Sequence, residues 1–435
     1  MFAYYLDLAL RSFRRNRILT VLMVLAIALG IGACMTTMTV FRVLSGDPIP
    51  ERSERLYYVQ LDAEGAAGQV AGDEPAGQLT RFDAEALLRE ARGDRQAMMS
   101  GGSAVVRPAQ AGLDPFIVNV RYTSADFFAM FGTPFLYGGG WRAADDQGRA
   151  RLVVLSREAN ERLFGGEDST GRSLRVDDTD FQVAGVLDRW RPTPYFFDLN
   201  ASGGRFRNSE ELFLPFQTAI DLKMRRRGTM SCWGDTQGDD TGLNAPCIWI
   251  QYWVELDTPD KVAAYRDYLE RYSDQQRAAG RFERPTNTRL RDVMAWLRFN
   301  EVVPGDVRLQ LWLSLGFLLV CLVNTVGLLL AKCLRRSPEI GVRRALGASR
   351  RAIFLQFLVE AGVVGLAGGA LGLGLAWLGL WAVRQTPVGY ADAVGMDWQM
   401  LLFTLVLALL SSLAAGLLPA WRACQVSPAS QIKSQ

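Results

Sequence analysis

Four long runs with almost no charged residues constrain this 435-residue chain more than any other feature. They occupy residues 18–41, 309–331, 352–383 and 398–421 and hold about a quarter of the chain. A helix needs roughly 20 apolar residues to cross the hydrocarbon core of a bilayer, and each run is long enough. The sequence therefore predicts an integral membrane protein with four transmembrane helices. The apolar stretch of the first run exceeds a signal-peptide core, so we expect a retained signal anchor.

Arginine and lysine residues set the expected orientation, because positive residues beside a span stay in the cytoplasm. Residues 1–17 carry four arginines against one aspartate, and residues 332–351 carry seven basic residues against one glutamate. Residues 384–397 carry one arginine and two aspartates. We expect residues 1–17, 332–351 and 422–435 in the cytoplasm. The large insert, 42–308, and the short loop, 384–397, are expected outside.

The composition excludes several classes of site. The chain has no histidine, which removes His-based triads, His metal ligands and imidazole proton relays. None of its four lysines follows a glycine, so the G-x-x-x-x-G-K-[ST] nucleotide loop is absent. The net charge of +3 gives no general case for nucleic-acid binding. We therefore expect no catalytic residue, no metal site and no bound cofactor on this chain.

Two of the six cysteines, Cys232 and Cys247, lie in the insert at either side of a Gly/Asp-rich stretch. A disulfide is permitted in the outside compartment and would contribute on the order of 3 kcal/mol by closing this loop. Two free thiols are the alternative. The remaining cysteines lie in or beside the spans and are expected to act as small apolar side chains.

Local patterns in the insert predict mixed α/β structure with short caps and turns. The expected strands are 152–155, 173–176, 181–186 and 248–256, and the expected helices are 157–164 and 258 to about 272. Leu290, Val293, Met294 and Leu297 recur at the spacing of one helical face. This stripe belongs either to the domain core or to a stalk that leads into the second span.

The basic loop between the second and third runs contains the signals of a short helix. Residues 337–339, Ser-Pro-Glu, combine an N-cap, the first helical position that suits proline, and an acidic residue at the positive helix end. Arg343 and Arg344 suit the opposite end, and Gly347 suits a C-terminal cap. A basic membrane anchor needs no such signals, so we expect a helix that is presented to a cytoplasmic partner.

This block, Glu-Ile-Gly-Val-Arg-Arg-Ala-Leu-Gly-Ala at 339–348, resembles the signature of the permeases of MacB/FtsX-type, or type VII, ABC transporters. Further similar segments are 10–17, Asn324, 356–361, 368–372 and 418–423, with 152–155, 163–165, 171–172 and 181–187 in the insert. The resemblance extends over most of the chain but is weak at about 190–285.

The resemblance implies a bacterial inner-membrane permease subunit with four spans and a MacB-like periplasmic core domain. It implies a dimer, of identical or related copies, that works with separate ATPase subunits, because this sequence carries no ATPase of its own. ATP and Mg would be bound by that partner. Such permeases couple ATP hydrolysis to movement of the outer domain, by mechanotransmission, and in several members that domain meets an adaptor protein and a TolC-like outer-membrane channel.

The resemblance also assigns candidate residues. The expected ATPase-coupling surface consists of Glu339, Ile340, Gly341, Arg343, Arg344 and Gly347. Glu360 is expected at the inner membrane boundary, snorkelling or paired with arginine rather than acting as a buried switch. Asn324 is expected to hydrogen-bond between helices. Two overlapping G-x-x-x-G spacings, Gly365 with Gly369 and Gly368 with Gly372, suit close helix packing, within the subunit or at a dimer seam.

Four functions remain open from the sequence. The first is an export or efflux permease, and the second is a permease that releases lipoproteins. The third is an FtsX-like regulator of a cell-envelope hydrolase, which the long insert disfavours. A stand-alone membrane sensor or enzyme is the fourth, and it leaves the capped basic helix unexplained.

Overall fold

The structure is a computed structural model. It describes residues 17–67, 69–70, 72–108, 114–200, 204–206, 210–386, 390–391, 394–395 and 398–425. The chain divides into a membrane unit, Met1–Ser45 with Val303–Gln435, and an insert unit, Gly46–Val302. Most of the expected cytoplasmic termini, 1–16 and 426–435, and parts of the loop 384–397 lie outside the described residues.

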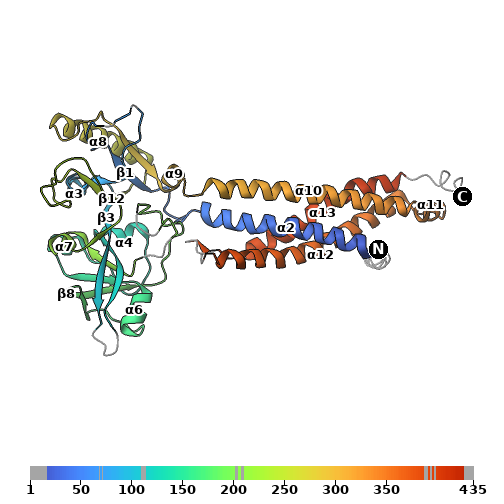
Figure 1. Cartoon of the computed structure of the whole chain (residues 1–435), viewed down its shortest axis with the longest axis horizontal. Coiled ribbons are helices and arrows are strands. Elements are labelled where there is room, and N and C mark those ends of the chain that lie inside the picture. Colours follow the sequence, from blue (N-terminus) through green and yellow to red (C-terminus); the bar gives the residue numbers. More distant parts are fainter. Residues whose placement is uncertain are drawn as a thin grey trace. The chain divides into compact units, whose positions relative to one another are not determined.

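Four helices in the described part of the membrane unit are long and apolar enough to cross a bilayer. They are α2 (Arg17–Ser45), α10 (Gly305–Arg335), α12 (Arg350–Arg384) and α13 (Trp398–Cys424). Even the 27-residue α13 is about 40 Å long at 1.5 Å per residue, which exceeds a hydrocarbon core of roughly 30 Å. Each helix contains one predicted run, and the fold class of four spans with an insert after the first is confirmed. The four helices run side by side (Figure 1).

The four predicted packing glycines of α12 face two neighbouring helices of the same chain. Gly365 and Gly369 face α13, and Gly368 and Gly372 face α2. A Cβ at Gly369 would lie 2.6 Å from the Cβ of Ala408, and one at Gly368 would lie 2.7 Å from Cγ2 of Ile27. The sequence left open a role within the subunit or at a dimer seam, and the structure uses both spacings within the subunit.

The insert unit is built on one mixed sheet, which has 13 strands within the described residues. The main path is β13 (Thr288–Asp292), β1 (Leu56–Leu61), β12 (Cys247–Glu255), β3 (Arg95–Arg107), β4 (Phe116–Thr123), β9 (Leu212–Pro215), β6 (Leu152–Leu155), β8 (Thr179–Leu187) and β5 (Phe135–Gly138). Short strands off this path are β2 (Leu79–Thr80), β7 (Ser173–Val176), β10 (Arg226–Arg227) and β11 (Ser231–Cys232). The pairs β4–β9 and β6–β8 are parallel and the other pairs are antiparallel.

Seven helices accompany this sheet in the described part of the insert unit. They are α3 (Arg81–Glu90), α4 (Asp126–Phe131), α5 (Ala143–Gln147), α6 (Arg157–Phe164), α7 (Phe216–Asp221), α8 (Pro259–Ala278) and α9 (Val293–Phe299). Successive strand residues point to opposite faces of the sheet, so Tyr58 and Val59 of β1 enter two different cores. The core around Tyr58 is dominated by aromatic side chains, including Phe127, Phe197 and Trp253.

Most local predictions in the insert hold. The strand β6 and the helix α6 have the expected bounds, because Ser156 caps α6 by accepting the N–H of Ala159 at 3.1 Å and Gly165 ends it in the left-handed conformation. The hairpin β7–β8 and the strand β12 are also present. The helix α8 is longer than predicted and ends at Ala278.

The predicted helical stripe of Leu290, Val293, Met294 and Leu297 is wrong for its first residue. Leu290 lies on β13, and α9 begins after Asp292, which caps it by accepting the N–H of Ala295 at 2.6 Å. Val293 and Leu297 are buried in the aromatic core of the insert unit. The stripe therefore serves the domain core, and these contacts give no support to a stalk.

Cys232 and Cys247 are joined in a disulfide that links β11 to the neighbouring β12. The other cysteines of the chain, Cys34, Cys321, Cys333 and Cys424, are free and buried in the membrane unit.

Candidate functional site

The predicted coupling helix is α11 (Ser337–Ala345), which lies at one end of the helix bundle between α10 and α12 (Figure 1). Its N-cap position is Arg336 rather than the predicted Ser337, which is the first helical residue; boundaries commonly differ by one position. Gly347 has a φ of +98°, a conformation that favours glycine, and ends the turn after the helix. Ser349 then caps α12 by accepting the N–H of Ala352 at 3.2 Å.

One face of α11 packs on the bundle. Ile340 and Gly341 are buried, and Ile340 belongs to a small apolar cluster with Cys333 of α10, Phe357 of α12 and Cys424 of α13. Two of the six predicted coupling residues therefore face the membrane helices. Their burial packs α11 against the bundle.

Polar side chains of α11 also attach it to α12 and α13. Arg343 donates to Oε1 of Gln356 on α12 at 3.2 Å and to Oε1 of Glu339 at 3.0 Å. Arg344 donates to the carbonyl oxygen of Cys424 on α13 at 3.3 Å. Arg343 and Arg344 thus attach α11 to the bundle, and Glu339 pairs with Arg343 within the helix.

The outward face of α11 is apolar, and sequence reasoning missed it. Val342 is 61% exposed and Leu346, at the end of the helix, is 83% exposed; Pro338 and Ala345 are exposed beside them. These positions share one side of a helix because they are three or four residues apart. Their spacing is visible in the sequence, but the block 339–348 has apolar residues on both sides, so the pattern alone cannot tell which side is buried.

Glu360 is buried in a charged cluster at the same end of the bundle. It is 1% exposed and forms an ion pair with Lys332 of α10. Its other oxygen lies 3.5 Å from Nη1 of Arg336, at the corner between α10 and α11. The structure thus pairs Glu360 with an arginine, one of the two roles expected from the sequence, and also with a lysine that the sequence analysis missed.

Asn324 lies on an exposed face of α10 and makes no hydrogen bond with another described residue. The predicted interhelical hydrogen bond is therefore not found among the described residues. A hydroxyl pair fills that role instead, since Thr37 of α2 and Ser314 of α10 lie 2.7 Å apart.

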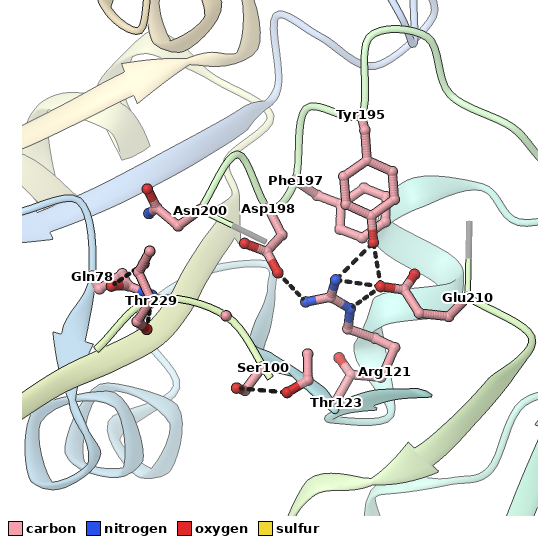
Figure 2. Close-up of polar contacts among 12 residues, drawn as sticks. Gln78, Ser100, Arg121, Thr123, Tyr195, Phe197, Asp198, Asn200, Glu210 and Thr229 are labelled. Atoms are coloured by element: carbon pink, nitrogen blue, oxygen red, sulfur yellow. Dashed lines mark hydrogen bonds and ion pairs between the residues drawn. The ribbon is translucent and has the colours of Figure 1, made fainter. Parts of the chain in front are cut away.

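A second buried charge cluster lies inside the insert unit (Figure 2). Arg121 on β4 is fully buried and donates through Nη1 to Oδ2 of Asp198 at 2.7 Å. Its Nε donates to Oε1 of Glu210 at 3.1 Å, and its Nη2 donates to the hydroxyl of Tyr195 at 2.6 Å. The cluster attaches the segment between β8 and β9 to the middle of the sheet. Most of this segment lies in the stretch 190–285, where the sequence resemblance is weak.

The surroundings of Arg121 keep its guanidinium ionised. Burial alone would lower the pKa of Arg121, but Glu210, Tyr195 and Asp198 outweigh it and hold the pKa well above its ordinary value. One oxygen of Asp198, Oδ1, is buried and accepts no hydrogen bond. A guanidinium with so high a pKa stays cationic near neutral pH, which suits its ion pairs with Asp198 and Glu210.

Comparison with known families decides the class of the protein. A model of the MacB-like periplasmic core domain matches residues 20–272, and a model of the FtsX-like permease C-terminal region matches residues 311–428. The chain belongs to the MacB/FtsX-like permease family. The first match reaches residue 272 and so includes most of the stretch 190–285, where the sequence shows little resemblance.

Curated relatives align with nearly the whole permease. "Pyoverdine export ATP-binding/permease protein PvdT" of Pseudomonas syringae pv. tomato is 24% identical over 434 residues, which is 97% of this chain and 58% of that protein. "Macrolide export ATP-binding/permease protein MacB" of Rhodospirillum rubrum is 27% identical over 436 residues, 98% of this chain and 60% of that protein. The permease thus spans less than two thirds of the length of these relatives.

Two solved structures also resemble the permease. The periplasmic region of MacB from Actinobacillus actinomycetemcomitans matches with a TM-score of 0.38 and 14% identity, over 61% of this chain and 100% of that one. The extracellular domain of the ABC-type transporter YknZ from Gram-positive bacteria matches with a TM-score of 0.35 and 11% identity, over 54% and 99%. Family membership rests on the two family models and not on these scores.

Proposed function

We propose that the permease is the membrane subunit of an ABC transporter, driven by a separate ATPase subunit that binds ATP and Mg²⁺. ATP hydrolysis would move α11, and the bundle would pass this motion to the insert unit, which drives export or efflux by mechanotransmission. Two relatives support this direction, because both are named as export ATP-binding/permease proteins and align with the permease over 97–98% of its length.

The outward apolar face of α11 carries the proposal. Val342 and Leu346 expose large aliphatic side chains on a helix whose other side is firmly packed. Exposed apolar residues at helical spacing are typical of a helix that inserts into a groove of another protein. A short, rigid helix of this kind can transmit a push from an ATPase, because its charged and buried residues fix it to α10, α12 and α13.

The assembly follows from the same reasoning. We place the protein in the bacterial inner membrane, with α11 and both termini in the cytoplasm and the insert unit in the periplasm. A second permease copy, identical or related, would supply a partner for Asn324, because an exposed amide within a membrane helix gains from an interhelical hydrogen bond. An adaptor protein and a TolC-like channel would continue the export path to the outer membrane.

The test is purification of the tagged permease from its native membrane, with quantification of bound P-loop ATPase by mass spectrometry. The unaltered protein should bring down an ATPase subunit in comparable amount. Val342→Asp with Leu346→Asp should reduce the bound ATPase by roughly tenfold or more, because charged groups cannot enter an apolar groove without a large desolvation cost. Leu243→Asp, the same change at an exposed leucine of the insert unit, is the matched control.

Two outcomes would contradict the proposal. If no ATPase accompanies the unaltered permease, even after ATP and vanadate trapping, the permease does not act as a subunit of such a complex. If the double aspartate variant binds as much ATPase as the control, the contact surface is not the outward face of α11. Arg343→Glu with Arg344→Glu gives a second readout: ATP hydrolysis should be uncoupled while the chain remains inserted and folded.

A further inference from the structure

Three buried charges meet where α10, α11 and α12 join. Lys332 lies one turn before the end of α10, Arg336 lies at the corner, and Glu360 lies on α12. All three are buried, and the two cations pair with different oxygens of the one carboxylate: Lys332 with Oε1 and Arg336 with Oε2. One carboxylate therefore contacts both basic groups.

Because the two cations lie close together, the stability of this corner depends on the carboxylate of Glu360. Lys332 and Arg336 are four residues apart, so they lie near the same side of the chain and repel each other unless an anion lies between them. Burial strengthens that repulsion, because the dielectric constant of the interior is low. Removing Glu360 breaks both buried contacts at once, whereas removing Lys332 leaves the contact between Arg336 and Glu360.

The other polar ties of α11 are weaker. Glu339 and Arg343 form an ion pair whose side chains are about one third exposed. Exposed ion pairs of this kind contribute little to stability, whereas breaking a buried pair is strongly unfavourable. The position of the corner should therefore depend on Glu360 more than on the polar contacts along α11.

We propose that Glu360 is a positioning residue that latches the start of α11 to α12 by neutralising Lys332 and Arg336 together. The latch makes α11 and the ends of α10 and α12 move as one body, so that displacement of α11 reaches the membrane helices. This inference rests on the proposed function for its role in transport, but the latch itself can be tested without any partner. Among the described residues, the Nε of Arg336 is buried without a hydrogen-bond partner, and Glu360 is the acidic group that pairs with its guanidinium.

Two native cysteines report on the latch. Cys333 and Cys424 lie in the apolar cluster covered by Ile340 of α11, and both are buried. If the latch opens, α11 should lift and a membrane-permeant maleimide should reach both thiols. Peptide mass spectrometry resolves each site, and Cys34 and Cys321, which are buried elsewhere in the membrane unit, are internal controls.

The expected ranking of cysteine labelling among the variants distinguishes a latch formed by charge from a side chain that only fills space. Glu360→Gln should raise labelling of Cys333 and Cys424 by roughly tenfold or more, because it breaks both buried ion pairs at once. Lys332→Gln should raise it by no more than about threefold, because the pair of Arg336 and Glu360 remains. Glu339→Gln is the matched control, an identical change in a partly exposed pair, and should leave labelling unchanged. The exchange of Lys332→Glu with Glu360→Lys should restore protection.

The proposal is overturned if Glu360→Gln and Lys332→Gln give equal labelling, or if Glu360→Gln stays protected. Where the Glu360→Gln chain does not accumulate in the membrane, the exchange variant decides: it keeps the same charges in a new order, and exposed cysteines in that variant overturn the latch.

A second readout tests transmission in the complex with the ATPase. Glu360→Gln should lower the permease-dependent stimulation of ATP hydrolysis by roughly tenfold, while the ATPase still co-purifies because the outward face of α11 is intact. If Glu360→Gln exposes Cys333 and Cys424 to labelling but ATP hydrolysis is still stimulated as in the unaltered permease, the transmitting role is overturned. Failure of the unaltered permease to bind any ATPase would count against the proposed function instead, and the labelling ranking would still decide the latch.

Discussion

At the scale of single residues, Arg121 is a buried cation that pairs with two buried carboxylates of the insert unit. Arg121→Met would leave Asp198 and Glu210 buried without their cation, which should lower the free energy of unfolding by about 3–5 kcal/mol. Denaturant unfolding of the detergent-solubilised chain, followed by tryptophan fluorescence, measures the loss. The control is Arg149→Met, whose partner Asp221 is 48% exposed, and its cost should stay below about 1 kcal/mol. Equal costs would contradict the prediction.

Asp146 should make the stability of the insert unit depend on pH. Burial raises the pKa of its carboxyl to about 6, although the N–H groups of Ala125 and Trp141 donate to it at 2.6 and 2.7 Å. Because the folded-state pKa is raised above about 3.9, the stabilisation is fully present below about pH 4 and is lost as pH rises through about 6.

The expected loss for Asp146 is no more than about 3 kcal/mol between pH 4 and 7. Unfolding measured across this pH range should show a shallower decline in Asp146→Asn than in the unaltered chain. Asp221→Asn, at an exposed carboxylate, should keep the original decline. An unchanged slope in Asp146→Asn would show that this group does not titrate in the range.

At the scale of elements, α12 packs through glycines that have no room for a side chain. Gly368→Val should destabilise the bundle by about 1–3 kcal/mol, because its Cβ would overlap with Ile27 of α2. Gly374→Val is the matched control on the same helix, since a Cβ there meets open space. Thermal unfolding in detergent compares the two variants. Equal loss in both would indicate that the backbone effect of valine, rather than packing, limits stability.

Local signals predicted some elements well and failed at others for a physical reason. Ser156 caps the start of α6 and Gly165 ends it. Both signals lie next to the helix in the sequence, so the bounds of α6 could be predicted. Leu290 also fits a helical stripe with Val293, but its strand β13 exists because it pairs with β1, more than 200 residues earlier. A pairing between distant segments leaves no periodic signal in either segment alone.

At the scale of the whole molecule, the orientation in the membrane is a testable prediction. In spheroplasts, a membrane-impermeant maleimide should label Leu243→Cys in the insert unit directly, because that side is expected outside. Leu346→Cys, after α11, should be labelled only after lysis. Both leucines are exposed, so the comparison reports on side rather than on burial. The reverse pattern would invert the topology and remove the cytoplasmic ATPase contact.

The sequence by itself determined the number of spans, the position of the insert, the short helix after the second span and the family. These properties are predicted from signals carried by contiguous residues, namely the length of the apolar runs, the charges beside a span and the helix caps. Only the tertiary structure decided that α11 turns Val342 and Leu346 outward, that Glu360 pairs with Lys332, and that Arg121 holds Glu210. The partners in those pairs lie 28 and 89 residues apart, and burial and ion pairing depend on which surfaces meet when the chain folds.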